Sequence, residues 1–306
     1  MKKNIVAIVV SYLTLYIVWG STYLAIRIAV TTIPPFYLVA LRFLISGGAF
    51  LLIALVSGRL RRPPTLKELL SALFLGLFLL ILGNGLVSVG ERTVDSYIAA
   101  IIISSTPFCV AFFNRILFGE RLHPARLLGM LLGLAGVVAI LWKGEGEGFS
   151  AGPGVLFVIA GFMAWGFATS AARRLPVHAD SVVNSGIEMT LAGVIAFIGS
   201  VVAYGPPGAA LASVTPVSWL ALAYLAVFGG SAFYAYTYLL ANEPSIRVVS
   251  YSIVNPLIAV LLGMAVLGEK PVPLLWLGAP AILAGLALML YGERLLNLVA
   301  SRPPRD

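Results

Sequence analysis

The sequence predicts an all-α integral membrane protein with ten transmembrane helices arranged as two inverted five-helix repeats. Three observations predict this fold. Hydrophobic residues make up 60% of the 306 positions and charged residues only 10%, whereas soluble domains are about 45–50% apolar. The apolar residues fall into ten runs of about the 20 residues that a helix needs to cross a bilayer. A charged corner, FGERLHPARLLG at 118–129, returns as LGEKPVPLLWLG at 267–278.

Proline, glycine and charged residues separate the apolar runs, and the loops between them are too short for a soluble domain. The first run follows Lys2 and Lys3, as in a secretory signal, but it extends beyond the about 7–15 apolar residues of such signals. We therefore expect it to be a retained membrane span. The ten expected spans are 5–30, 35–57, 68–89, 96–118, 125–143, 152–172, 181–203, 217–241, 247–267 and 274–296.

The distribution of basic residues predicts the orientation of the chain. With the N-terminus inside and ten spans, fifteen of the 20 Lys and Arg residues fall on the inner side, three on the outer side and two within spans. Short inner loops are enriched in Lys and Arg, so both termini are expected in the cytoplasm. The net charge of +8 is then a topology signal rather than a sign of nucleic-acid binding, and no basic patch with interleaved aromatic residues is present.

The two halves of the sequence match each other. A shift of 149 residues aligns both Gly-Glu corners, and Pro107 with Pro256, while a shift of 146 aligns Trp19-Gly20 with Trp165-Gly166. We expect one repeat at 1–146, a second at 150–297 and a cytoplasmic tail at 298–306. Five spans per repeat is an odd number, so the second copy enters the membrane from the opposite side. Inverted repeats of this kind are typical of secondary transporters that work by alternating access.

Several segments resemble the EamA family of the drug/metabolite transporter superfamily. They are WGSTYLAIR at 19–27, LRFL at 41–44, GNGLVSVGE at 83–91 and the two Gly-Glu corners. The resemblance covers nearly the whole chain. It implies a ten-helix carrier of the bacterial inner membrane that exports amino acids or other small metabolites, and it does not define the substrate.

Polar and aromatic residues inside the spans are candidates for lining a substrate cavity, because polar groups are costly in a bilayer. Those near Trp-Gly and Gly-Asn-Gly sequences combine side-chain groups with close backbone approach, although small residues also simply pack helices. Proline frees the carbonyl four residues earlier, which points to Ile103 and Ser252 near the membrane centre. The candidates are Trp19, Ser21, Thr22, Tyr23, Asn84, Thr106, Trp165, Tyr234, Tyr251 and Asn255.

Glu188 is the acidic residue that lies well within a span, with Asn184 one turn earlier on the same face. A charged group at the membrane centre costs roughly 2.5–3.5 kcal/mol on insertion scales, so this carboxyl group needs a proton or a partner. We expect Glu188 to couple transport to protons or to receive a cationic group. The alternatives are a structural pair with an arginine or access to inner water.

Five other residues are expected to have structural roles. Pro107 and Pro256 bend their spans, and Glu120 and Glu269 favour the positive N-terminal ends of the helices that follow them. Arg42 is expected to bond helix ends or carbonyl groups, with an anion site as the alternative.

Other classes of function fit the sequence less well. An intramembrane enzyme needs a nucleophile with a base, or a metal, but both histidines fall in polar turns and the single cysteine stands alone. No cofactor and no metal are therefore expected. A channel more often shows rings of like residues in an oligomer. The expected partners are a small-molecule substrate and the lipid bilayer, in a monomer or homodimer, and broad drug efflux is the alternative to metabolite export.

Overall fold

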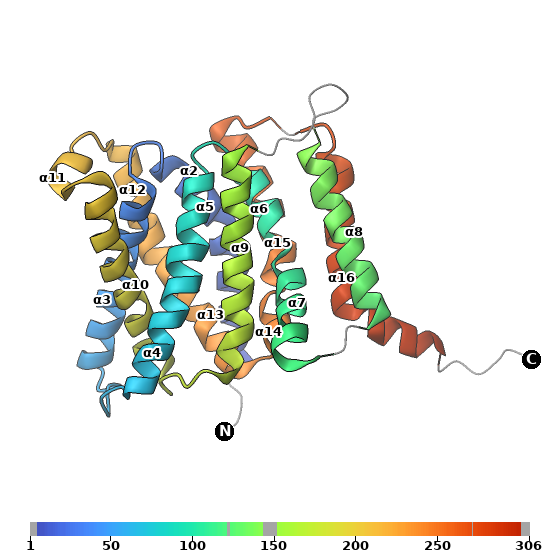
Figure 1. Ribbon diagram of the computed structural model, residues 1–306, viewed down its shortest axis with the longest axis horizontal. Coiled ribbons are helices and arrows are strands. Elements are labelled where there is room, and N and C mark those ends of the chain that lie inside the picture. Colours follow the sequence, from blue (N-terminus) through green and yellow to red (C-terminus); the bar gives the residue numbers. More distant parts are fainter. Residues whose placement is uncertain (1–4, 121–122, 143–151, 271, 301–306) are drawn as a thin grey trace, which may run out of the picture.

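A computed structural model describes residues 5–120, 123–142, 152–270 and 272–300, and the secondary-structure elements in these ranges are helices joined by turns and loops (Figure 1). Within them, seven helical segments are long and apolar enough to cross a membrane. Three further apolar helices, Pro124–Ile140, Val254–Leu267 and Leu275–Met289, are shorter. Each of these segments overlaps one of the predicted spans, which agrees with an all-helical membrane fold. The predicted repeat boundary at 146–150 and residues 301–306 of the predicted tail lie outside the described residues.

The first half of the chain builds five helical rods, three of which contain irregular turns. In chain order they are α1 (Ile5–Thr14) with the π-helical η1 (Leu15–Trp19) and α2 (Gly20–Ala29); α3 (Pro35–Val56); α4 (Leu66–Leu75) with the π-helical η2 (Gly76–Asn84) and α5 (Gly85–Gly90); α6 (Ser96–Ile103) with α7 (Thr106–Phe118); and α8 (Pro124–Leu141).

The second half follows the same order. Its elements are α9 (Pro153–Ala171) with the 3₁₀ turn η3 (Ala172–Arg174); α10 (Ser181–Tyr204) and the short α11 (Pro207–Ala210); α12 (Pro216–Tyr224) with the π-helical η4 (Leu225–Gly229) and α13 (Gly230–Asn242); α14 (Ser245–Val248) and α15 (Tyr251–Leu262) with the π-helical η5 (Gly263–Leu267); and α16 (Leu275–Ala300).

Local sequence explains where the rods begin. Proline occupies an N-terminal position in α3, α8, α9 and α12, where its missing N–H is not needed. Thr65 and Glu68 form a reciprocal capping box at the start of α4. The Asp180 carboxylate accepts hydrogen bonds from the backbone N–H groups of Val182 and Val183 at 2.9 and 3.2 Å. Each cap satisfies amide groups that a helix start leaves without a partner.

The two charged corners share a backbone conformation but have different partners. Gly119 and Gly268 end α7 and η5 with φ of 66° and 64°, a left-handed conformation that favours glycine. Glu120 pairs with Arg173 at 2.5 Å. The Glu269 carboxylate instead accepts hydrogen bonds from the backbone N–H and hydroxyl of Ser96, both at 2.9 Å. Glu269 thus sits at the start of α6, not at the start of the helix that follows it in sequence.

Two antiparallel helix pairs pack through glycines at opposite ends of the molecule (Figure 1). Where α8 meets α16, a Cβ on Gly129 would lie 2.5 Å from the carbonyl oxygen of Gly285, and one on Gly136 would lie 2.6 Å from that of Gly278. Where α3 meets α10, a Cβ on Gly47 would lie 2.6 Å from the backbone nitrogen of Thr190. These distances leave no room for a side chain, so the backbones are in direct contact.

We expect Gly129→Ala to destabilise the protein by about 1–3 kcal/mol, the usual cost of overpacking. The added methyl group would meet the Gly285 carbonyl of α16, which has no rotamer to change. Gly199→Ala on α10 is the matched control, because nothing lies within 4 Å of its Cβ position. Thermal unfolding of the purified variants in detergent measures the difference, and equal stability of the two variants would contradict the packing described.

Candidate functional site

The interior of the helical bundle contains a wide cavity of about 710 Å³. Loop residues after α7, α9 and α13 line it, and it extends inward to Glu188 on α10. Its lining is mixed polar and apolar. The polar and charged residues of the lining are Asn114, Glu120, Arg126, Thr169, Arg173, His178, Ser181, Asn184, Glu188, Thr237, Glu243 and Ser245.

Glu188 lies at the inner end of the wide cavity, and its side chain is only 1% exposed. The Asn184 amide donates a hydrogen bond of 2.8 Å to one of its carboxyl oxygens, Oε1. The other oxygen, Oε2, is buried and has no hydrogen-bond partner among the described residues. The predicted pairing of these two side chains on one helix face is thus present, and one oxygen is left over for a proton or a ligand.

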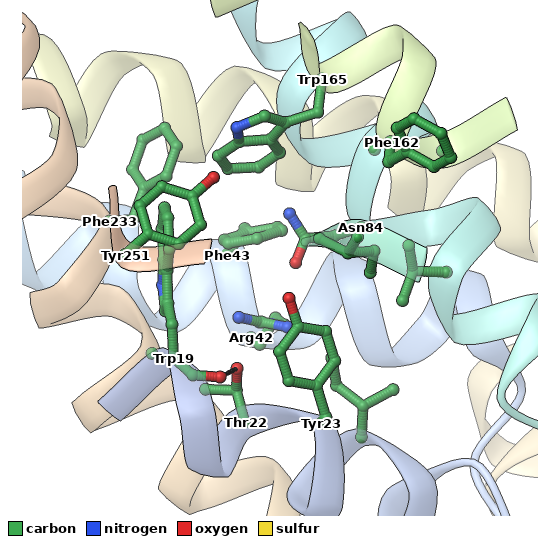
Figure 2. Close-up of a pocket in the computed structure, with 16 residues that line it drawn as sticks. Trp19, Thr22, Tyr23, Arg42, Phe43, Asn84, Phe162, Trp165, Phe233 and Tyr251 are labelled. Atoms are coloured by element: carbon green, nitrogen blue, oxygen red, sulfur yellow. Dashed lines mark hydrogen bonds between the residues drawn. The ribbon is translucent and has the colours of Figure 1, made fainter. Parts of the chain in front are cut away.

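A second cavity of about 60 Å³ lies near the centre of the bundle (Figure 2). Aromatic rings form much of its wall, and its polar lining residues are few. The lining consists of Trp19, Thr22, Tyr23, Ile26, Arg42, Phe43, Gly83, Asn84, Val87, Ile103, Gly161, Phe162, Trp165, Gly229, Phe233 and Tyr251.

A chain of aromatic contacts leads from the lining of the small cavity to the lining of the wide cavity. The rings of Trp19 and Trp165 meet edge to face at 5.4 Å between centroids, and each lies 5.2 Å from the ring of Tyr236. The Tyr236 hydroxyl is 2.5 Å from the hydroxyl of Thr169, a lining residue of the wide cavity. We call Trp19, Trp165 and Tyr236 the aromatic partition. Trp19 and Trp165 line the small cavity, Tyr236 reaches the wide cavity only through Thr169, and the described linings of the two cavities have no residue in common.

Arg42 is the charged residue in the lining of the small cavity. Its side chain is 3% exposed, and its Nε and Nη1 atoms have no hydrogen-bond partner in the part of the chain that the structure describes. The guanidinium carbon lies 4.6 Å from the centre of the Phe43 ring. The predicted structural role, bonding helix ends or carbonyl groups, is not seen at these two nitrogens.

Six of the ten predicted cavity residues surround the small cavity. Figure 2 shows their side chains together with those of Arg42, Phe43, Phe162 and Phe233. The six are Trp19, Thr22, Tyr23, Asn84, Trp165 and Tyr251.

The other four predicted cavity residues line neither cavity. The Ser21 hydroxyl lies 2.6 Å from that of Tyr224, and the Tyr234 ring stacks on Phe50 at 5.5 Å. Thr106 donates a hydrogen bond of 2.6 Å to the Ile103 carbonyl. With its amide oriented to satisfy both groups, Asn255 donates to the Tyr16 and Tyr251 carbonyls at 3.1 Å each.

The Ile103 carbonyl is therefore not the free group that Pro107 was expected to leave. The preceding turn breaks at Ser104 and Ser105, and the Thr106 hydroxyl satisfies the carbonyl instead. Pro256 lies inside α15. Pro107 thus follows an irregular point of its rod, whereas Pro256 lies within a continuous helix.

Comparison with known proteins gives consistent results. The model of the EamA-like transporter family matches residues 6–142 and again residues 152–291. The chain is 37% identical over 284 residues to "Uncharacterized inner membrane transporter YedA" of Escherichia coli K12, covering 92% of this chain and 90% of that protein. It is 25% identical to "WAT1-related protein At3g02690, chloroplastic" of Arabidopsis thaliana, covering 90% of this chain and 67% of that protein.

A solved structure titled "Crystal structure of protein" superposes with a TM-score of 0.68 at 24% identity. The match covers 94% of this chain and 98% of that one. This similarity concerns the fold.

Proposed function

Because the chain belongs to the EamA-like transporter family, we propose that it is a secondary carrier that exports small metabolites, such as amino acids, across the inner membrane by alternating access. The observation that carries this proposal is the wide cavity, which runs from the loops on one side to Glu188 and is separated from the small central cavity by the aromatic partition. A carrier open to one side has this arrangement, whereas an open pore has a continuous path.

Reciprocal contacts support two inverted five-helix repeats. With the shift of 149 residues, Gly129 corresponds to Gly278 and Gly136 to Gly285, so the contacts Gly129–Gly285 and Gly136–Gly278 are images of each other. Such reciprocity is the property of a twofold interface. The double match of the family model along the chain also supports two repeats.

Contacts between other equivalent residues support the same symmetry near the cavities. With the shift of 146 residues, Trp19 corresponds to Trp165, and these two rings touch at 5.4 Å. The π-helical segments η2 and η4 begin at residues 76 and 225, which are related by the shift of 149. The small cavity thus lies where the proposed halves meet, as expected for a substrate site of an inverted-repeat transporter.

We propose that the wide cavity opens to the cytoplasm. Arg173, Arg126 and Glu120 line it, and the α3–α4 loop contains Arg59, Arg61 and Arg62. The end of α16 lies on the same side as this loop (Figure 1). The enrichment of basic residues in cytoplasmic loops supports the proposal that both termini lie in the cytoplasm.

Cysteine accessibility tests this direction. In a Cys109→Ala background, which removes the single native cysteine, we expect Asn114→Cys to react with a membrane-impermeant thiol reagent in inside-out vesicles. Thr22→Cys, in the small cavity, should react at least about tenfold more slowly, because it lies beyond the aromatic partition. Reaction of Asn114→Cys in intact cells but not in inside-out vesicles would reverse the proposed direction.

The function itself is tested by reconstitution. Purified protein in liposomes should show saturable counterflow of a labelled metabolite, chosen by comparing the metabolite and toxic-analogue tolerance of cells with and without the protein. Currents far above carrier turnover, without saturation, would exclude a carrier. The central cavity of about 60 Å³ favours small metabolites over the bulky compounds of a broad drug efflux carrier.

A further inference from the structure

Arg42 carries a buried positive charge, and two of its nitrogens have no hydrogen-bonded partner among the residues that the structure describes. We propose that Arg42 binds the carboxylate group of the transported substrate, so that the substrate class is small organic acids or carboxylate-bearing metabolites. This inference deepens the proposed transport function and rests on it. A guanidinium group binds a carboxylate through charge-assisted hydrogen bonds, and the Nε and Nη1 atoms, which have no partner among the described residues, are available as donors.

The nearest buried acidic group does not occupy this role in the structure. Glu91 is fully buried at the end of α5, and both of its carboxyl oxygens lack a hydrogen-bond partner within the described ranges. It does not line the small cavity. Arg27 binds its main-chain carbonyl instead. The lining residues that the structure describes therefore include a cationic group and no carboxylate.

The remainder of the cavity suits the other part of such a ligand. Tyr23 and Asn84 add polar groups beside Arg42, and Trp19, Phe43 and Trp165 supply apolar walls (Figure 2). One water needs about 10–15 Å³ of cavity, so a cavity of about 60 Å³ accepts a carboxylate with a short carbon chain. Larger ligands require the walls to move apart.

The inverted repeat gives Arg42 a counterpart of opposite charge. The shift of 146 residues relates Arg42 on α3 to Glu188 on α10, and each lines a different cavity. In this helix pair Gly47 faces Thr190 and Leu44 faces Gly193. The position on α10 that faces Arg42 is therefore about seven residues away from Glu188. At 1.5 Å per residue this is roughly 10 Å along the helices. The two charged groups of a compact zwitterion therefore cannot contact both residues at once, and the anionic end belongs to Arg42.

Thermal protection of the purified full-length protein tests the inference without requiring transport. The probes are propionate and butyrate, compared with the neutral isosteres propionamide and butyramide at constant ionic strength. We expect the carboxylates to raise the unfolding midpoint by about 2–4 °C at saturating concentration, and the amides to have a smaller effect. Equal protection by acids and amides would overturn the proposal.

Variants assign the effect to the arginine. Arg42→Gln should remove the difference between the thermal protection by acid and by amide, and Arg42→Lys should retain part of this difference. The control is Arg59→Gln, at an exposed ion pair with Asp180, which should retain all of it. If Arg42→Gln fails to fold, Gly229→Ala replaces it, because a Cβ there would lie 3.0 Å from Nη2 of Arg42 and crowd the guanidinium. A full acid preference in Arg42→Gln, or in Gly229→Ala if that variant is used, overturns the proposal.

A double variant separates a ligand role from neutralisation of Glu91. If Arg42 binds the substrate, Arg42→Gln/Glu91→Gln remains inactive in counterflow, whereas recovery to wild-type rates would show that Arg42 only balances Glu91 and would overturn the inference. If counterflow is absent from the wild-type protein while carboxylates still protect it through Arg42, the anion site stands and the transport function fails.

Discussion

Glu188→Gln is expected to abolish the pH dependence of transport, so that the ratio of initial rates with and without a pH gradient falls to about one. The reason is the position of this carboxyl group. It is buried in the lining of the wide cavity, with one oxygen bound to Asn184 and the other without a partner in the described part of the chain. An ionised carboxylate inside a membrane costs about 2.5–3.5 kcal/mol, so closing the cavity favours proton uptake. A glutamine keeps the size and the hydrogen bond but cannot carry the proton.

The measurement is counterflow and net efflux in liposomes, with an internal dye that reports pH. Glu120→Gln is the control, because it removes a carboxylate from the same cavity, one that is paired with Arg173 at 2.5 Å. Glu120→Gln should keep the pH response of the wild type. An unchanged pH response in Glu188→Gln would remove the coupling role from this residue.

Trp165→Ala is expected to open a path between the two cavities. The indole ring contacts Trp19 at 5.4 Å and Tyr236 at 5.2 Å, and it lines the small cavity from the α9 side. Its removal deletes one of the three rings of the aromatic partition and costs about 3–5 kcal/mol of stability. Labelling of Thr22→Cys from the wide cavity should then rise about 10- to 100-fold, since every 1.4 kcal/mol of opening free energy changes the open population tenfold.

Two further variants make this result specific. Trp165→Phe keeps a ring at the position and should leave the labelling of Thr22→Cys low. Trp219→Ala removes an indole that is 40% exposed on α12 and should also leave it low. Slow labelling in Trp165→Ala would mean that other side chains separate the cavities.

Much of the fold could be predicted from the sequence, because span length and loop charge follow directly from the bilayer. The Gly-Glu corners were recognisable as equivalent, and both contain a glycine with positive φ. The partners of their glutamates were not predictable, because Ser96 and Arg173 come from distant parts of the chain. Contacts of this kind depend on how the helices assemble.

The candidate site was predictable where residues differ from their surroundings and unpredictable where they do not. Trp19, Asn84 and Trp165 stand out in apolar spans, and all three line the small cavity. Phe43 and Phe233 line it as well, but a phenylalanine in a membrane span gives no sign of whether it faces lipid or a cavity. The Ile103 carbonyl, expected to be free, instead accepts a hydrogen bond from the hydroxyl of Thr106, three residues later.

The glycine contacts between α8 and α16 also limit how the sequence can change. At Gly129 and Gly136 the obstacle to a larger side chain is a main-chain oxygen of the facing helix. A smaller side chain on the facing helix therefore creates no space for a larger residue at Gly129 or Gly136. A substitution at the facing residue cannot suppress the packing defect of such a variant. In a genetic selection, revertants of such variants should restore glycine itself.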